Sequence, residues 1–189
     1  GDLVATTDAG NGVINMGTLV VGGSIALTTD GNGNATVEDL GRFIFGPSTV
    51  RGNLTATSTG GHMQQSGALT ITGTSAFTTS ANNKSITLND ADNAFTGALT
   101  ITTNDNSGAD SNARIDGGTT ALIIAASTID GDLTLTSGAT AGITDSGTVT
   151  VGGDLAATTD AGNGVIDMDQ LAVDGSIALV TDGNGAATV

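Results

Sequence analysis

The sequence predicts an all-β protein that folds as a parallel β-helix (β-solenoid), and three observations lead to this prediction. The composition lacks helix formers, the sequence repeats itself at several scales, and each short repeat opens with alternating apolar and polar residues. Among 189 residues there are 30 glycines and one proline, whereas Glu38 and Lys84 are the only glutamate and the only lysine. Residues that usually fill exposed helical positions are therefore rare, which argues against a helical bundle.

The longest repeat starts at Gly1 and starts again at Gly153. Residues 1–37 and 153–189 align without a gap and differ at 8 of 37 positions, at a shift of 153 − 1 = 152. We therefore predict one continuous β-helix over residues 1–189, in which residues 1–152 form one long repeat and residues 153–189 begin the next.

A short unit, Gly-x-[Leu/Ile]-x-apolar-x-[Thr/Ser], divides the long repeat, with Ser75 as one exception at an apolar position. The units start at Gly1, Gly23, Gly52, Gly73, Gly97, Gly131, Gly153 and Gly175. They form two triplets, residues 23–96 and 97–174, and each triplet opens with its longest unit. In addition, residues 48–55 match residues 127–134 at a shift of 79. We predict about six coils per 152-residue repeat.

Each unit is expected to contain a strand, a turn and a second strand. In residues 131–137, Leu133 and Leu135 point to one side of the strand, while the threonines between them point to the other. Turns such as residues 160–164 are rich in Gly, Asn and Asp, and residues 67–71 are typical of the second strand. Stacking the units predicts one internal ladder of Leu3, Ile25, Leu54, Leu99, Leu133, Leu155 and Ile177. An antiparallel β-sandwich would explain alternating strands, but not these ladders or a long period that simply continues.

The charge balance excludes several functional classes. The chain has 19 acidic and 4 basic residues, a net charge of −15, and no cysteine. Four basic residues cannot form the basic face of a nucleic-acid-binding protein, and a disulfide scaffold is excluded. No segment approaches the ~20 apolar residues of a membrane span, so we expect no membrane insertion. The acidic charge is expected to keep a β-rich rod soluble.

Three segments resemble the repeats of a known family: Asn93–Ile101 (NAFTGALTI), Ser127–Thr134 (STIDGDLT) and Gln65–Ile71 (QSGALTI). They are similar to the long repeats of filamentous-haemagglutinin-like surface proteins, which are very large exoproteins of Gram-negative bacteria. Such proteins are exported by the two-partner route or as autotransporters. The resemblance implies a right-handed β-helical shaft, located extracellularly at the bacterial cell surface, with a role in attachment or fibre building. Export and tip domains of that family are not recognised in this sequence.

We therefore expect a non-enzymatic shaft of a secreted surface fibre or giant adhesin. The shaft would continue in the same chain or self-associate end to end into filaments. The alternative is an adhesin segment that binds surface glycans through exposed Thr and Asn ladders. The aspartates are spread at about one per turn, and His62, the only histidine, is expected to be a surface turn residue with no serine or cysteine constellation.

Calcium is the one cofactor that the sequence suggests. Asp30, Asn32 and Asn34 are spaced like the first oxygen ligands of a calcium loop. However, Gly41 stands where such a loop needs glutamate, and Ala186 replaces Asn34 in the second copy. The same residues are typical of tight turns, so a structural turn is the competing interpretation.

Residues 37–47 differ most from the regular coil. They contain the only proline and two of the four phenylalanines. One interpretation is an enlarged corner with extra core packing. The other is a ridge that contacts a partner through Arg42, Phe43, Phe45 and Pro47, since Phe and Arg favour interfaces.

One outward column of threonines is also expected. Its members are Thr6, Thr28, Thr57, Thr78, Thr102, Thr136 and Thr158. Binding to ice would require a second matching column, which only three coils provide, so these threonines are best explained as strand formers on an exposed face.

Overall fold

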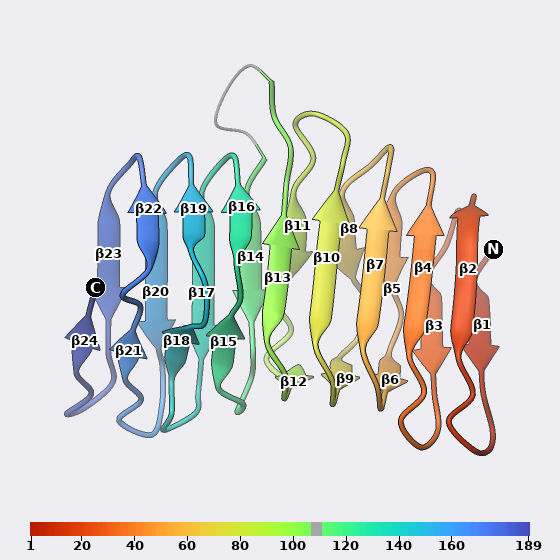
Figure 1. The fold of residues 1–189 in the computed structure, drawn as a ribbon, viewed down its shortest axis with the longest axis horizontal. Coiled ribbons are helices and arrows are strands. Elements are labelled where there is room, and N and C mark those ends of the chain that lie inside the picture. The colour runs from red at the N-terminus through yellow and green to blue at the C-terminus, as the bar shows by residue number, and fades with distance from the viewer. Residues whose placement is uncertain (107–110) are drawn as a thin grey trace.

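The protein consists of parallel β-strands wound into a rod, as shown by a computed structural model that describes residues 1–106 and 111–189 (Figure 1). No helix occurs among the described residues. Sheet A comprises β1 (Leu3–Thr6), β3 (Ile25–Thr28), β5 (Phe43–Phe45), β6 (Ser48–Val50), β8 (Met63–Gln65), β9 (Leu69–Ile71), β11 (Ile86–Leu88), β12 (Ala94–Phe95), β14 (Ala113–Asp116), β17 (Leu133–Ser137), β20 (Leu155–Thr159) and β23 (Ile177–Val180). Sheet B comprises β2 (Ile14–Leu19), β4 (Ala35–Asp39), β7 (Leu54–Ser58), β10 (Ser75–Thr79), β13 (Leu99–Thr102), β15 (Leu122–Ile124), β16 (Ser127–Ile129), β18 (Ile143–Asp145), β19 (Val149–Val151), β21 (Ile166–Asp167), β22 (Leu171–Val173) and β24 (Ala187–Thr188).

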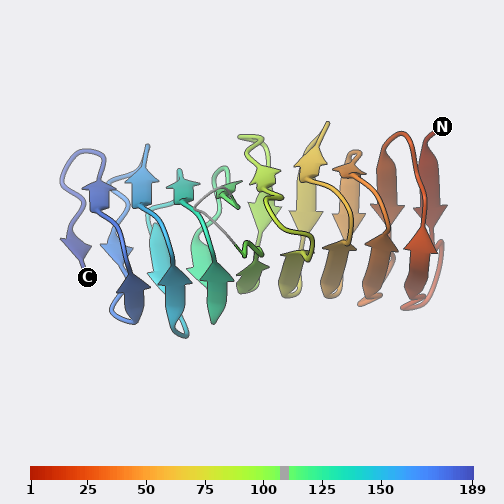
Figure 2. The ribbon, with the colours of Figure 1, turned by 90° about the horizontal axis from the view of Figure 1, so that it is seen from above.

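The chain passes alternately through the two sheets and makes about eight turns. In Figure 1 the front strands point up and the rear strands point down, while the chain advances from right to left, which is a right-handed coil. Seen from above, the strands lie in two rows along the rod (Figure 2). Coiling in one direction pairs parallel strands without the crossover helices that they otherwise need. The predicted all-β, right-handed parallel β-helix is thus confirmed.

The number of turns differs from the expected six coils per long repeat. Seven pairing steps lead from β1 to β20, the strands that open the two copies, so one long repeat makes seven turns. The difference arises in the two longest units, which start at Gly23 and Gly97. Each of them makes about one and a half turns, so β3 lies in sheet A but β7, which opens the next unit, lies in sheet B.

The predicted single leucine ladder is consequently wrong, because it crosses from one sheet to the other. Leu3 pairs with Ile25 in sheet A, whereas Leu54 and Leu99 lie on either side of Ser75 in sheet B. The ladder of Leu133, Leu155 and Ile177 is again in sheet A. The predicted threonine column also changes sheet twice, after Thr28 and again after Thr102. Units that look equivalent in sequence therefore lie on opposite faces of the rod.

Two serines that are equivalent in sequence also make equivalent hydrogen bonds, although they lie in different sheets. Ser48 in β6 donates to the carbonyl of Gly46 (2.8 Å) and accepts the N–H of Leu27 (3.0 Å). Ser127, the equivalent serine in β16, donates to Ala125 (2.8 Å) and accepts from Ile101 (3.0 Å). Both serines lie where one pass through a sheet is split into two strands, but β6 belongs to sheet A and β16 to sheet B. The repeat that relates Ser48 to Ser127 is therefore three and a half turns long.

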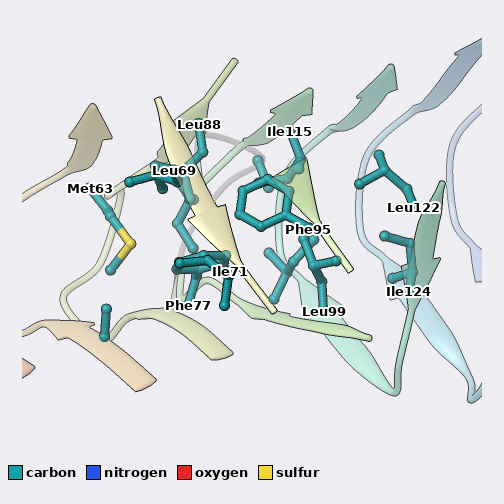
Figure 3. Packing of buried hydrophobic residues seen from close by; sticks show 14 of the residues in the cluster. Met63, Leu69, Ile71, Phe77, Leu88, Phe95, Leu99, Ile115, Leu122 and Ile124 are labelled. Carbon is teal, nitrogen blue, oxygen red and sulfur yellow. The ribbon is translucent and has the colours of Figure 1, made fainter. Parts of the chain in front are cut away.

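The interior is a continuous apolar core with one aromatic section. Figure 3 shows the part of this core around Phe77 and Phe95. The ring centroids of Phe43 and Phe45 are 4.5 Å apart, those of Phe45 and Phe77 6.0 Å, and those of Phe77 and Phe95 5.9 Å. All four rings, which are the only phenylalanines of a protein without Tyr or Trp, are 0% exposed. Edge-to-face pairs at such distances add to the stabilisation from burial.

Ser75 occupies an inward position that the other units give to an apolar residue. It pairs with Leu54 and Leu99, is 2% exposed, and its hydroxyl has no hydrogen-bond partner among the described residues. A buried hydroxyl without a partner costs free energy. We expect Ser75→Ala to raise the free energy of unfolding by about 1 kcal/mol in urea denaturation. Ser58→Ala should instead lower it, because the Ser58 hydroxyl donates to the carbonyl of Gly61 (2.8 Å).

Candidate functional site

The rod offers surfaces rather than a pocket. No pocket is found, and no group of three or more His, Cys, Asp or Glu residues is placed to hold a metal ion, within the described ranges. A helix long and apolar enough to span a membrane is likewise absent from the residues that the structure describes. The candidate functional features are therefore the side chains on the two outer faces and at the corners.

Polar side chains at the strand starts link each coil to the next. Asp2 Oδ1 accepts the backbone N–H of Ser24 (2.8 Å), and the residue preceding the strand plays the same role in later coils. The further acceptor–donor pairs are Asn34–Asn53, Asn53–Thr74, Asn112–Asp132, Asp132–Asp154 and Asp154–Ser176, at 2.7–2.9 Å. The aspartates of the Gly-Asp-Leu motifs thus satisfy backbone groups along the rod.

These hydrogen bonds lower the pKa of two carboxyl groups. The backbone N–H and then the hydroxyl of Ser24 lower the pKa of Asp2, and Ser176 lowers the pKa of Asp154 in the same way. In contrast, burial raises the pKa of Asp116, against the opposing effect of its hydrogen bond from the N–H of Gly118.

The lowered pKa of Asp154 predicts an acid-sensitive contribution to stability. This contribution is complete above the ordinary pKa of 3.8 and is lost as the pH falls through the lower pKa of the folded state. Asp154→Asn keeps an acceptor oxygen but does not titrate. We expect the melting temperature of this variant to fall less between pH 5 and pH 2.5 than that of the wild type. The matched control is Asp167→Asn, at an exposed residue of β21, and equal behaviour of the two variants would contradict the prediction.

His62 belongs to the same coil-to-coil ladder. Its Nδ1 accepts the backbone N–H of Ser85 (3.0 Å) and lies 2.8 Å from the hydroxyl of Ser85. No serine or cysteine constellation is expected around His62, and the stacking of coils places one serine, Ser85, which lies one turn later in the sequence, beside it. Since the backbone N–H engages the Nδ1 lone pair, this nitrogen is not free to take the proton of the Ser85 hydroxyl.

A second ladder, which was not predicted from the sequence, consists of hydroxyls at the strand ends. Thr29 Oγ1 donates to the carbonyl of Gly33 (2.8 Å) and accepts the N–H of Arg51 in the next coil (3.0 Å). Thr7, Thr103 and Thr159 make the same pair of bonds. The signal in the sequence was a threonine at the last inward position, immediately before a Gly- and Asn-rich turn.

The calcium candidates lie in the turn after β3. The N–H of Asp30 donates to Thr7, the N–H of Asn32 donates to Asn11 Oδ1 (2.7 Å), and Asn34 Oδ1 accepts from Asn53 (2.8 Å). The three residues therefore take part in coil-to-coil bonding, and calcium binding stays a prediction.

The candidate interface at residues 42–47 is only partly on the surface. Arg42 and Pro47 are exposed, but Phe43 and Phe45 are 0% exposed because both face inward from β5, with Ile44 between them facing outward. The expectation that the two phenylalanines form a contact ridge is thus wrong. The interpretation as extra core packing describes them correctly.

The longest threonine column lies on the outer face of sheet B. Thr57, Thr78, Thr102, Thr128 and Thr150 pair consecutively through β7, β10, β13, β16 and β19. Thr128 and Thr150 were not in the predicted column, because the extra half turn after Gly97 places them there. The result is five threonines in successive coils, about 4.8 Å apart.

The fold and these ladders define a β-solenoid repeat protein. The family model described as "Repeats of unknown function (DUF5649)" matches residues 32–102 and 110–189, so the chain belongs to this family. The offset between the starts of the two matches, 110 − 32 = 78, agrees with the repeat of three and a half turns. Comparisons with curated proteins and with solved structures find no match.

Proposed function

We propose that this chain is the structural shaft of a secreted bacterial surface fibre or giant adhesin. The observation that carries this proposal is the continuity of the rod. Backbone pairing runs from coil to coil, from β1 to β23 and from β2 to β24, and the apolar core runs along the rod with it. Shorter runs of polar side chains, such as Asn112–Asp132–Asp154–Ser176, add coil-to-coil hydrogen bonds. Such a rod supplies length and stiffness. The location at the surface of a Gram-negative bacterium is what the resemblance to filamentous-haemagglutinin-like repeats implies.

Length is then encoded by repeat number. Seven turns at about 4.8 Å give about 34 Å for each long repeat. Because residues 153–189 repeat residues 1–37, a further copy of residues 38–152 after Val189 continues the same register. Fibre growth by continuation of the chain and growth by end-to-end stacking of copies both follow from this register.

The shaft proposal predicts a measurable increase in length. We expect a chain extended after Val189 by residues 38–152 and then by residues 1–37 to gain about 34 Å in its maximum dimension in small-angle X-ray scattering. Its cross-section should stay unchanged. The control is an insert with the same residues in scrambled order, which should not lengthen the rod in this way. A gain in cross-section without a gain in length would contradict the proposal.

Glycan binding is the second candidate function, and the sheet B threonine column is the observation that favours it. Thr57, Thr78 and Thr102 present hydroxyls at a regular spacing. The column has a charged neighbour at one end only, where Glu38 pairs with Thr57. The Asn ladder is less suited to this role, because the oxygens of Asn34 and Asn53 accept backbone N–H groups. If the sheet B threonine column binds glycans, the wild-type protein should be retained by at least one polysaccharide of a glycan array. Thr78→Asp should abolish this retention, whereas Thr158→Asp on sheet A should not. Absence of retention of the wild type on a glycan array would contradict it.

A further inference from the structure

One column of side chains on the outer face of sheet A carries charges of opposite sign at the two ends of a run of six coils, from β5 to β20. The strands β5, β8, β11, β14, β17 and β20 pair in register, so the residues that immediately precede them are neighbours along the rod. In this order they are Arg42, His62, Ser85, Asn112, Asp132 and Asp154. These six positions thus begin with a cation and finish with two carboxylates, and the column continues beyond them with the uncharged Ser176 before β23.

These charges are not paired within the chain. None of the four basic side chains forms an ion pair among the described residues. Arg42 is exposed, and four coil steps, about 19 Å, separate it from Asp132. That separation exceeds the Debye length of about 8 Å at physiological salt, so attraction between the two ends is screened.

The column is complementary to itself when its direction is reversed. If a second copy lies antiparallel and face to face, Arg42 meets Asp154, His62 meets Asp132, and Ser85 meets Asn112. In the adjacent outward column, two residues further along each strand, the same register brings Ile44 to Ala156, Gln64 to Thr134 and Thr87 to Arg114, so no like charges are opposed. A two-fold axis that runs parallel to the strands between β11 and β14 generates all of these contacts, as an isologous dimer requires.

The corresponding column of sheet B has no such pattern. The residues that precede β4, β7, β10 and β13 are uncharged: Asn34, Asn53, Thr74 and Ala98. The complementarity is therefore a property of one face of the rod and not of the fold in general.

We propose that two copies of this chain associate laterally and antiparallel through the outer faces of sheet A, with Arg42 of each copy paired with Asp154 of the other. Five coil steps by a strand of about five residues cover about 24 × 17 Å, or about 400 Å² per copy. This is the size of weak, transient interfaces, so the association is salt-dependent and of low affinity. The pairing goes beyond the proposed shaft function and does not depend on it, since the length measurement above tests the shaft alone.

Sedimentation equilibrium of the whole chain tests the pairing. We expect a monomer–dimer equilibrium at about 150 mM salt, where the Debye length of about 8 Å screens the repulsion between two copies of net charge −15 while charge pairs in contact still attract. Arg42→Asp should weaken the dimer at least tenfold, because it places carboxylates opposite one another. Arg51→Asp is the matched control: it changes the net charge equally, but Arg51 follows β6 and lies outside the column, so the change should be less than threefold.

The combination of Arg42→Asp with Asp154→Arg exchanges the two charges and should restore association. Circular dichroism of each variant establishes that the β-structure is retained. A wild type that stays monomeric at millimolar concentration in about 150 mM salt would overturn the proposal. Equal weakening by Arg42→Asp and Arg51→Asp would also overturn it, whatever the behaviour of the double variant.

Discussion

Asn93→Asp should lower the free energy of unfolding by at least about 3 kcal/mol. Asn93 is 2% exposed, and its side chain makes hydrogen bonds within its own coil and to the coils on both sides. Its Nδ2 contacts Gln65 Oε1 (3.1 Å), the carbonyl of Leu88 (3.3 Å) and the carbonyl of Asp116 (3.0 Å). Its Oδ1 accepts from Gln65 Nε2 and from the N–H of Leu69, both at 2.9 Å.

The physical reason is that aspartate has the shape of asparagine but lacks the amide donors. A carboxylate oxygen would face three oxygens in a buried position, or the group would have to take up a proton to avoid the charge. Urea denaturation at pH 7 measures the effect. Asn89→Asp makes the same chemical change at an exposed residue and should alter stability by less than about 0.5 kcal/mol. Similar losses for the two variants would show that the amide network does not hold the coils together.

Phe77→Ala should lower the free energy of unfolding by about 3–5 kcal/mol. Phe77 lies between Phe45 and Phe95 and is 0% exposed, so its removal leaves a cavity in the core and breaks both edge-to-face contacts. The rod cannot collapse easily around this cavity, because the backbone of each coil is fixed by pairing with the coils on both sides.

Phe77→Leu separates the two contributions. It keeps most of the apolar volume but loses the ring contacts, and we expect a loss of about 1–2 kcal/mol. Thermal unfolding followed by far-UV circular dichroism would measure both variants. If alanine and leucine were equally tolerated, the aromatic section would not be a close-packed part of the core.

Much of the fold could be predicted from the periodicity alone. The alternation in residues 131–137, the Gly- and Asn-rich turns and the long period each correspond to a feature of the rod. The register of individual units could not be predicted. The long units that start at Gly23 and Gly97 are explained equally well by a loop insertion in one coil or by an extra half turn. The structure shows the extra half turn and not a loop insertion, because β7 pairs with β4 in sheet B.

The surface features were predictable only where neighbouring residues along the chain decide them. Arg42 and Pro47 are exposed as expected, whereas Phe43 and Phe45 are buried because alternation in β5 turns both inward. The contact between His62 and Ser85, the extension of the threonine column to Thr150, and the column from Arg42 to Asp154 each join residues that are far apart in sequence.

The sequence by itself determined that this protein is a repetitive, acidic, all-β coil, since composition and period leave few other ways to bury its apolar residues. Only the tertiary structure decided which face each unit occupies. The reason is geometrical: the shorter repeat, which relates Ser48 to Ser127, is three and a half turns long, so successive repeats are rotated by half a revolution. Equivalent residues of successive repeats, such as Ser48 in sheet A and Ser127 in sheet B, therefore lie on opposite sides of the rod.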